Sequence, residues 1–216
     1  PSHADLGLSP GLDFETRLVV KPNAPERLAE ALARPRYRPA TIAIGTNTDP
    51  YQPVEREHRV MRGVLEVLSE ARHPVAITTK GALVTRDSDL LGAMGRAGLA
   101  SVTVSLTTLD PHLHRRLEPR AAAPARRLAA IRTLAAAGVP VGVNIAPVIP
   151  ALNEAEIERL LEAAADAGAA WAGHILLRLP REVAGLFRDW LAEHCPDRAG
   201  RVMTKLREMH GGRDYD

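Results

Sequence analysis

The feature of this sequence that most constrains its fold is the regular alternation of short apolar runs with amphipathic stretches. Three of the amphipathic stretches end in the same way, in "RAGLASV", "AAGVPVG" and "DAGAAWA", with a glycine just before the next apolar run. Gly98, Gly138 and Gly168 therefore stand where a helix ends on a left-handed residue. This pattern predicts helices that each lead directly into a strand.

Six strands are expected from the apolar runs, at 18–20, 41–44, 75–78, 101–106, 139–145 and 174–177. Helices are expected at 24–33, 54–72 and 87–97, and also after Pro124, after Asn153 and around Val183. Asn153 and Glu156 have the spacing of a capping box, in which each side chain accepts from a backbone N–H of the same helix start.

A polar residue closes each of the last five apolar runs. These residues are Thr46, Lys80, Ser105, Asn144 and Arg178, at separations of 34, 25, 39 and 34 residues. One strand–helix unit takes roughly 30 residues or more, so the spacing indicates an array of such units. The strands are almost continuously apolar, as in a parallel sheet covered on both faces. The sequence predicts an α/β fold, a (β/α) barrel or open barrel, with a doubly wound sheet as the alternative.

Composition narrows the class of protein. A chain of 216 residues with 45% hydrophobic and 25% charged residues suits a single globular domain, here 1–216, in which 1–16 form a long loop. No apolar run approaches the roughly 20 residues of a membrane span and no signal peptide opens the chain, so a cytoplasmic location without membrane contact is expected. The single cysteine, Cys195, excludes a disulfide framework and a cysteine-ligated metal site built from this chain alone.

Charge and aromatic content argue against nucleic acid as a partner. The formal net charge is only +2 and aromatic residues make up 3% of the chain, which leaves few stacking platforms and little excess positive charge. Arginine supplies nearly all of the positive charge, because lysine occurs only at positions 21, 80 and 205.

Ligands of parallel α/β folds bind at the carboxyl ends of the strands, which makes the polar strand ends the candidate site. After "TIAI", the residues Thr46, Asn47, Thr48 and Asp49 supply hydroxyls, an amide and a carboxylate. They form either a turn before Pro50 or part of a binding site.

Lys80 ends the run "VAITTK". An amine at this position binds a carboxylate or phosphate, or acts as a Schiff-base nucleophile. The structural alternative is a lysine that extends from a strand end into solvent.

The next two strand ends carry Ser105 and Asn144. Beyond Ser105, His112 and His114 form an H-x-H pair, for which a solvated helix start is favoured over a metal site because no second ligand cluster matches it. After Asn144, Pro147 and Pro150 force an extended exit. We expect this exit to leave backbone groups free to contact a planar ligand.

The segments "GLSPGLDFET", "IGTNTDPYQPVE", "ITTKG", "VSLTTLDPHLHRRLEPRAAAPARRLAAIRTLAAAGVPVGVNIAPVIPALN" and "LLRLP", in this order, closely resemble radical S-adenosylmethionine (radical SAM) proteins. The similar branch is the one described as DNA repair photolyase-like, which is related to spore photoproduct lyase. The resemblance covers essentially the whole chain. It implies a partial (β/α)6 barrel of the TIM-like kind that forms the radical SAM core.

The resemblance also implies cofactors and roles. Such proteins hold a [4Fe-4S] cluster on a C-x3-C-x2-C loop, bind S-adenosylmethionine to it, and on reduction by an electron donor generate a 5′-deoxyadenosyl radical. By resemblance, the loop from Thr46 through Asn47 and Thr48 to Asp49 lies near the methionyl amino group. Lys80 and Ser105 match residues that contact the methionyl carboxylate and the ribose region, and Arg120 is a further carboxylate candidate. Asn144, Ala146 and Pro147 match the segment that lines the ribose and adenine.

One departure from the family pattern is decisive for activity. The C-x3-C-x2-C loop is absent, and Cys195 cannot replace it. In the family this loop comes immediately before the segment with which this chain begins, so the resemblance implies that the cluster ligands lie upstream of Pro1. The 216 residues alone are expected not to assemble the cluster.

The sequence leads to three hypotheses about function. The leading hypothesis is a lyase-like radical SAM enzyme core whose substrate is unknown, with repair of a nucleic-acid lesion as one candidate. The alternatives are a barrel aldolase or lyase that uses Lys80 as a Schiff-base lysine, and a non-catalytic ligand-binding module.

Overall fold

The computed structural model describes residues 7–8, 13, 16–180 and 182–213. The chain forms two compact units. The larger unit comprises Pro22–Val148 and Asn153–Leu176, and the smaller comprises Pro1–Lys21, Ile149–Leu152 and Leu177–Asp216. The single domain expected over 1–216 stays a prediction, and most of the loop expected over 1–16 lies outside the described residues.

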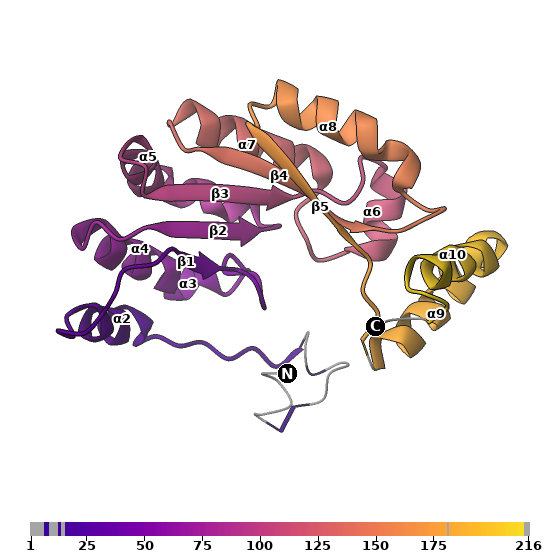
Figure 1. Ribbon diagram of the computed structural model, residues 1–216, viewed down its shortest axis with the longest axis horizontal. Helices are drawn as coiled ribbons and strands as arrows, with labels where there is room; N and C mark the ends of the chain where they lie inside the picture. The colour runs from indigo at the N-terminus through magenta and orange to yellow at the C-terminus, as the bar shows by residue number, and fades with distance from the viewer. Residues whose placement is uncertain (1–6, 9–12, 14–15, 181, 214–216) are drawn as a thin grey trace. The chain divides into compact units, whose positions relative to one another are not determined.

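The larger unit is built on a five-stranded parallel sheet (Figure 1). Its strands are β1 (Ile42–Ile44), β2 (Val75–Thr79), β3 (Ala100–Ser105), β4 (Val141–Val148) and β5 (Trp171–Leu176). They lie side by side in chain order, β1-β2-β3-β4-β5. A doubly wound sheet reverses its direction of growth at a switch point, so this order excludes that alternative. The predicted α/β fold, consistent with a partial TIM-like barrel, is confirmed.

The connections between strands are helical. They contain α3 (Glu55–His58), α4 (Val60–Glu70), η2 (Ala82–Asp87), α5 (Ser88–Arg96), α6 (Pro111–Leu117), α7 (Pro124–Ala136), η3 (Glu154–Glu156) and α8 (Ile157–Asp166), while α2 (Ala24–Leu32) precedes β1. Helices α5, α7 and α8 contact the sheet, and α2 packs on α4. Gly98, Gly138 and Gly168 follow α5, α7 and α8 with φ of 70°, 82° and 98°, which confirms the predicted left-handed helix ends. Among the described residues, no helix combines the length and apolarity that crossing a bilayer requires.

The core of the larger unit lies between these helices and the sheet. One apolar cluster joins Leu65 and Leu68 of α4 to Ile77 of β2 and Leu134 of α7. A second joins β4 to α8 through Val143, Ile145, Leu160 and Ala164. Both clusters consist of apolar residues from helices and strands that the sequence pattern predicted. Their burial holds the helices against the sheet, and the candidate site lies at one edge of that sheet.

Two local expectations are wrong. Residues 18–20 form no strand, and Leu18 and Val19 are 46% and 57% exposed. The helix expected over 54–72 is broken at Arg59, whose φ is 51°. The break has a physical cause, because the carboxylate of Glu55 accepts hydrogen bonds from the N–H groups of Val60 and Met61 and so caps the start of α4.

In the part of the smaller unit that follows Leu177, the helices α9 (Glu182–His194) and α10 (Pro196–Met209) contact each other. Their buried residues include Leu191, Val202 and Leu206. The rings of Phe187 and Trp190 stack with their centroids 5.8 Å apart.

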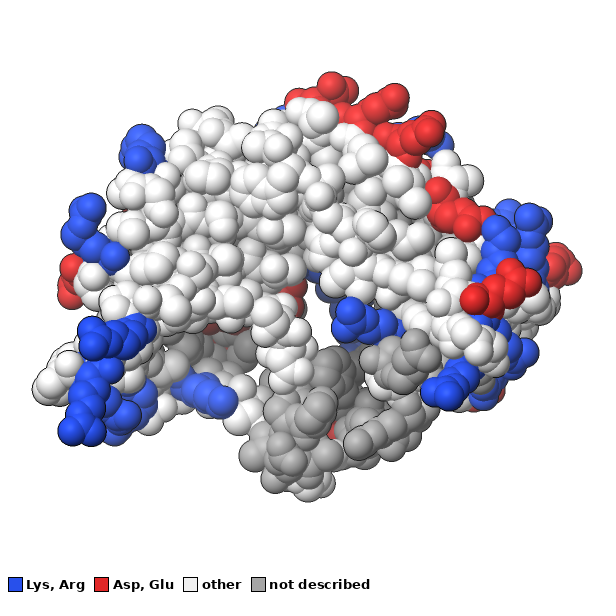
Figure 2. Space-filling view, in the orientation of Figure 1, with Lys and Arg blue, Asp and Glu red and all other residues white. Residues whose placement is uncertain are grey.

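Charged side chains are unevenly distributed on the larger unit. Figure 2 shows that the surface over β3, β4 and the upper part of β5 carries no lysine, arginine, aspartate or glutamate atoms in this view. Trp171 and Ile175 of β5 are 40% and 41% exposed. This patch is therefore uncharged in the view of Figure 2.

The loop after β1 approaches β2 so closely that only glycine fits at its start. Gly45 has φ of 91°, and a Cβ atom built on it would lie 1.9 Å from the carbonyl oxygen of Thr78. We expect Gly45→Ala to lower the free energy of unfolding by about 3 kcal/mol or more, because β1 must move away from β2. Urea denaturation followed by circular dichroism measures this loss.

Gly98→Ala is the matched control. Gly98 has φ of 70°, but nothing lies within 4 Å of the Cβ atom that alanine would add. This variant should lose only about 1 kcal/mol, the cost of the left-handed backbone alone. Equal losses in the two variants would contradict the close approach of the loop after β1 to β2.

Candidate functional site

The carboxyl ends of β1 to β4 bring the polar residues singled out in the sequence to one edge of the sheet. Thr79 of β2 pairs with Val104 of β3, and Ser105 pairs with Asn144 of β4. Lys80 directly follows Thr79, and the loop from Thr46 to Asp49 follows β1. Arg178 belongs to the smaller unit and is exposed.

Asp49 ties the loop after β1 to the end of β2. Its Oδ1 accepts hydrogen bonds from the hydroxyl of Thr79, at 2.6 Å, and from the backbone N–H of Tyr51, at 2.8 Å. Its Oδ2 accepts from the backbone N–H of Lys80 at 2.6 Å. Both carboxylate oxygens are therefore used inside the protein, so Asp49 shapes the loop. Thr46, Asn47 and Thr48 are the exposed residues of this loop.

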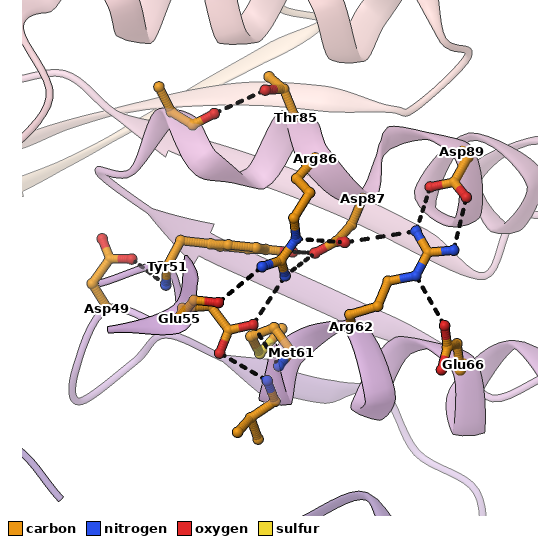
Figure 3. Close-up of polar contacts among 12 residues, drawn as sticks. Asp49, Tyr51, Glu55, Met61, Arg62, Glu66, Thr85, Arg86, Asp87 and Asp89 are labelled. Carbon is orange, nitrogen blue, oxygen red and sulfur yellow. Dashed lines mark hydrogen bonds and ion pairs between the residues drawn. The ribbon is translucent and has the colours of Figure 1, made fainter. Parts of the chain in front are cut away.

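A second polar network anchors the same loop from behind (Figure 3). The hydroxyl of Tyr51 donates to Asp87 at 3.1 Å, and Asp87 is fully buried. Arg86 donates to Asp87 at 2.8 Å and to Glu55 at 2.9 Å, both through Nη2. Burial, followed by the negative charge of Asp87, raises the pKa of Tyr51, which keeps this hydroxyl a donor. Arg62 reaches the network from α4, with Nη1 3.7 Å from Asp87.

Lys80 takes part in a buried ionic cluster that the sequence patterns did not predict. Its ammonium donates to Oε1 of Glu118, which lies just after α6. Oε2 of Glu118 accepts from Nη2 of Arg127 on α7 at 2.7 Å, and the hydroxyl of Thr107 lies 3.0 Å from Oε1. The side chain of Arg127 is 1% exposed, that of Glu118 is 9% exposed and that of Lys80 is 35% exposed. Lys80 is thus the member of the cluster that reaches solvent.

Two opposing effects act on the pKa of Glu118, burial and the neighbouring positive charges. Burial acts to raise the pKa of its carboxyl group, but the charges of Lys80 and Arg127 and their hydrogen bonds outweigh burial and lower the pKa. Glu118 is therefore a carboxylate at neutral pH. Its two oxygens are therefore charged acceptors for the donors of Lys80 and Arg127.

The two histidines of the H-x-H pair differ in exposure, because His112 lies at the surface and His114 is buried. His112 is exposed and its backbone N–H donates to Asp110, as expected for a helix start. The expectation of a solvated position is wrong for His114, which is 6% exposed. Burial and the nearby charge of Arg127 lower the pKa of His114. Across the described part of the chain, no group of three or more His, Cys, Asp or Glu residues is placed to hold a metal ion.

The expected free backbone after Asn144 is instead the last part of β4, which contains Ala146 and Pro147. The carbonyl of Ala146 lies 2.9 Å from the hydroxyl of Thr107, and the carbonyl of Pro147 accepts from Nδ2 of Asn153 at 3.0 Å. The peptide between Ala146 and Pro147 is cis. These two carbonyls have internal partners, which corrects the expectation that they are free for a ligand. Asn144 is partly exposed beside Gly173.

The capping box expected at Asn153 and Glu156 does not form. Asn153 donates to the carbonyls of Thr107 and Pro147. Glu156 accepts from the hydroxyl of Thr108 at 2.5 Å and from the N–H of Leu109 at 2.8 Å. Both side chains therefore hold the loop after β3 in place instead of capping α8.

The predicted contact residues thus fall into two groups. Lys80, Ser105 and Asn144 share the carboxyl edge of the sheet with the loop that contains Thr46, Asn47, Thr48 and Asp49, and with Ala146 and Pro147. Arg120 is exposed two residues beyond Glu118. The arginine that binds the Glu118 carboxylate is Arg127, which the sequence patterns gave no reason to choose.

Residues 13–164, which include this whole edge, match the family model of the radical SAM superfamily. This chain belongs to that superfamily. Uncharacterized proteins of Mycobacterium tuberculosis and Mycobacterium bovis are 39% identical to it over 212 residues, which are 97% of this chain and 61% of each relative. An uncharacterized protein of Methanocaldococcus jannaschii is 29% identical over 141 residues, 64% of this chain and 50% of that protein. The radical SAM chain therefore spans less than two thirds of the length of these relatives.

Solved structures show the same fold. A spore photoproduct lyase variant with bound AdoMet and dinucleoside spore photoproduct superposes with a TM-score of 0.58 at 17% identity. The superposition covers 79% of this chain and 49% of the lyase. At this level of identity the likeness concerns the fold, which is that of the spore photoproduct lyase core.

The three hydrogen bonds of Asp49 lead to a prediction for this radical SAM core. Asp49→Asn replaces one accepting oxygen with an NH₂ group, which faces at least one donor that it cannot accept from. We expect a loss of about 2 kcal/mol in the free energy of unfolding, the cost of an unsatisfied buried donor. Asp110→Asn is the control, because asparagine caps a helix as well as aspartate does, and should change stability by less than about 0.5 kcal/mol.

The lowered pKa of Glu118 predicts a pH-dependent contribution to stability. A carboxyl group with a lowered pKa in the folded state stabilises above its unfolded pKa, about 4.5, and this stabilisation is lost as the pH falls through the folded value. Glu118→Gln should cost about 3 kcal/mol at pH 7, and less as the pH falls below about 4.5. Urea unfolding of both proteins at pH 7 and pH 4 gives the two differences.

The control for this prediction is Glu30→Gln, which removes an exposed partner of Arg27. It should change stability by less than about 0.5 kcal/mol at either pH. A Glu118→Gln difference that stays constant with pH would show that the charge of Glu118 is not what stabilises the fold.

Proposed function

We propose that this chain is the S-adenosylmethionine-binding core of a lyase-like radical SAM enzyme. The observation that carries the proposal is the family match over 13–164, because that span contains every residue predicted to contact S-adenosylmethionine. In such an enzyme, reductive cleavage of S-adenosylmethionine supplies a 5′-deoxyadenosyl radical to the substrate.

The residues at the sheet edge fit the polar parts of S-adenosylmethionine. Lys80 offers a partly exposed ammonium for the methionyl carboxylate. Thr46, Asn47 and Thr48 offer exposed hydroxyl and amide groups for the amino-acid end. Ser105 and Asn144, on adjacent strands, lie where the ribose is proposed to bind. Asp49 acts indirectly in this scheme, because its hydrogen bonds to Thr79 and Lys80 fix the position of the loop.

The [4Fe-4S] cluster does not fit the residues of this chain. Its 216 residues contain one cysteine, Cys195, where the family pattern requires three. The thiolates would have to come from outside these residues. An upstream coding sequence with C-x3-C-x2-C would support the proposal, and its absence from the gene would contradict the enzymatic part.

The ion pair of Lys80 bears on the alternative Schiff-base mechanism. A Schiff-base lysine attacks a carbonyl as the neutral amine and is usually desolvated or placed beside another cation. Lys80 instead lies in an ion pair with the buried carboxylate of Glu118, which is not the environment of a Schiff-base lysine. Borohydride treatment in the presence of small aldehydes or ketones should therefore leave Lys80 unmodified.

The proposal also concerns the substrate and the electron donor of the enzyme. A nucleic-acid lesion is a candidate because spore photoproduct lyase, with bound dinucleoside spore photoproduct, has the same fold. The surface over β3, β4 and the upper part of β5 offers no charged side chain to a nucleic-acid backbone in the view of Figure 2. An electron donor is a further required partner, since reductive cleavage consumes one electron.

A binding experiment with two ligands tests the proposed site on this chain. S-adenosylhomocysteine carries the carboxylate and amino group, and 5′-methylthioadenosine lacks both. Lys80→Met should weaken S-adenosylhomocysteine binding about tenfold, the loss of one charge-assisted hydrogen bond, and change methylthioadenosine binding by less than about twofold. Isothermal titration calorimetry measures both affinities.

Lys21→Met is the matched control, because Lys21 is an exposed lysine in the other compact unit. It should leave both affinities unchanged. Failure of the unsubstituted chain to bind S-adenosylhomocysteine would contradict the proposed function.

A further inference from the structure

Glu118 is the residue through which the structure controls Lys80. Its carboxylate accepts from the Lys80 ammonium on one oxygen and from Arg127 on the other. The hydroxyl of Thr107 also lies 3.0 Å from the oxygen that faces Lys80. A carboxylate with a hydrogen bond on each oxygen has little freedom to rotate. Glu118 therefore holds the ammonium of Lys80 in one orientation.

We propose that Glu118 is a positioning residue that aims the ammonium of Lys80 at the carboxylate of the bound ligand. The inference rests on the proposed function, in which that ligand is S-adenosylmethionine. An ammonium has three N–H donors in fixed directions around nitrogen. When one of them is held by Glu118, the other two point away from the carboxylate oxygen that accepts it, and the side chain of Lys80 is 35% exposed.

Arg127 supports this role without taking part in binding itself. Its side chain is 1% exposed, and each of its three nitrogens has a partner within the protein. Nε donates to the carbonyl of Ala122 at 2.7 Å, Nη1 to the carbonyl of Ser105 at 3.0 Å, and Nη2 to Glu118. Arg127 is therefore committed to holding Glu118, and Lys80 is the cation of this cluster that remains available to a ligand.

Preorganisation is the physical gain from this arrangement. A free lysine side chain has many rotamers and loses that freedom when a ligand is bound, which reduces affinity. Here the fold orders Lys80 in advance, through a carboxylate supplied by the segment between α6 and α7. The effect of Glu118 should accordingly be confined to ligands that carry a carboxylate for Lys80 to bind.

A double-mutant cycle tests whether Glu118 acts through Lys80. Glu118→Gln should weaken S-adenosylhomocysteine binding about tenfold and change 5′-methylthioadenosine binding by less than about twofold. In a Lys80→Met background the same substitution should have no further effect on S-adenosylhomocysteine. Calorimetry on the four chains, with folding checked by circular dichroism, gives the cycle.

A chemical readout follows Lys80 without any ligand. The chain has three lysines, at positions 21, 80 and 205. Acylation by an N-hydroxysuccinimide ester, quantified by peptide mass spectrometry, should be several-fold faster at Lys80 in Glu118→Gln than in the unsubstituted chain. The rates at Lys21 and Lys205 should stay constant, since general unfolding would raise all three.

Glu156→Gln is the matched control for both experiments. Glu156 is a carboxylate that holds the neighbouring loop through Thr108 and Leu109. Its substitution should leave the ratio of the two ligand affinities and the relative acylation rate of Lys80 unchanged. This variant separates a general effect of loosening the loops from a specific effect on Lys80.

The possible outcomes separate the inference from the function on which it rests. If the unsubstituted chain binds S-adenosylhomocysteine and Glu118→Gln binds it equally well or more tightly, Glu118 does not position Lys80 and the inference fails. If both ligands weaken equally, the role is merely structural and the inference fails. If the unsubstituted chain binds neither ligand, the proposed function fails, and the inference fails with it unless acylation of Lys80 still depends on Glu118. That dependence would leave Glu118 positioning Lys80 for another anionic ligand.

Discussion

The ion pairing of Glu118 is the interaction on which the candidate site most depends. A carboxylate as buried as this one is costly unless charged donors compensate for the lost water, and removal of one partner leaves the others uncompensated. Lys80 follows β2, whereas Thr107 and Arg127 lie at two places in the connection between β3 and β4, so one carboxylate joins these two neighbouring connections of the sheet. The geometry at the sheet edge is thus set by side chains that a ligand does not need to touch.

Asp49 fixes the neighbouring pair of strand ends, those of β1 and β2, in the same way. It joins the loop after β1 to Thr79 and Lys80, and behind it the contact of Tyr51 with Asp87 anchors the loop to η2. Lys80 is therefore held twice, through its backbone N–H by Asp49 and through its ammonium by Glu118. Neutralising the charge of Lys80 would need only one carboxylate. The presence of two indicates that the fold keeps Lys80 in a defined position.

The sequence predicted the features that depend on local patterns. Strands at the positions of β1 to β5 follow from apolar runs, and the left-handed Gly98, Gly138 and Gly168 follow from the recurrent helix ends. The missed residues depend on contacts between distant segments. Lys80 and Glu118 are 38 residues apart, and Thr108 and Glu156 are 48 apart. No periodicity in the sequence marks such a pair, so Glu118 and Arg127 were not among the expected site residues.

The same limit explains why the capping box was wrong. Asn153 and Glu156 have a spacing that satisfies a helix start locally, but the buried carbonyl of Thr107, the partly buried carbonyl of Pro147 and the N–H of Leu109 also need partners. The start of α8 can be hydrated, whereas the loop after β3 is covered by the fold. The side chains therefore go to the donors and acceptors that water cannot reach. Tertiary burial, rather than local spacing, determined which hydrogen bonds formed, and the expected solvated position of His114 failed for the same reason.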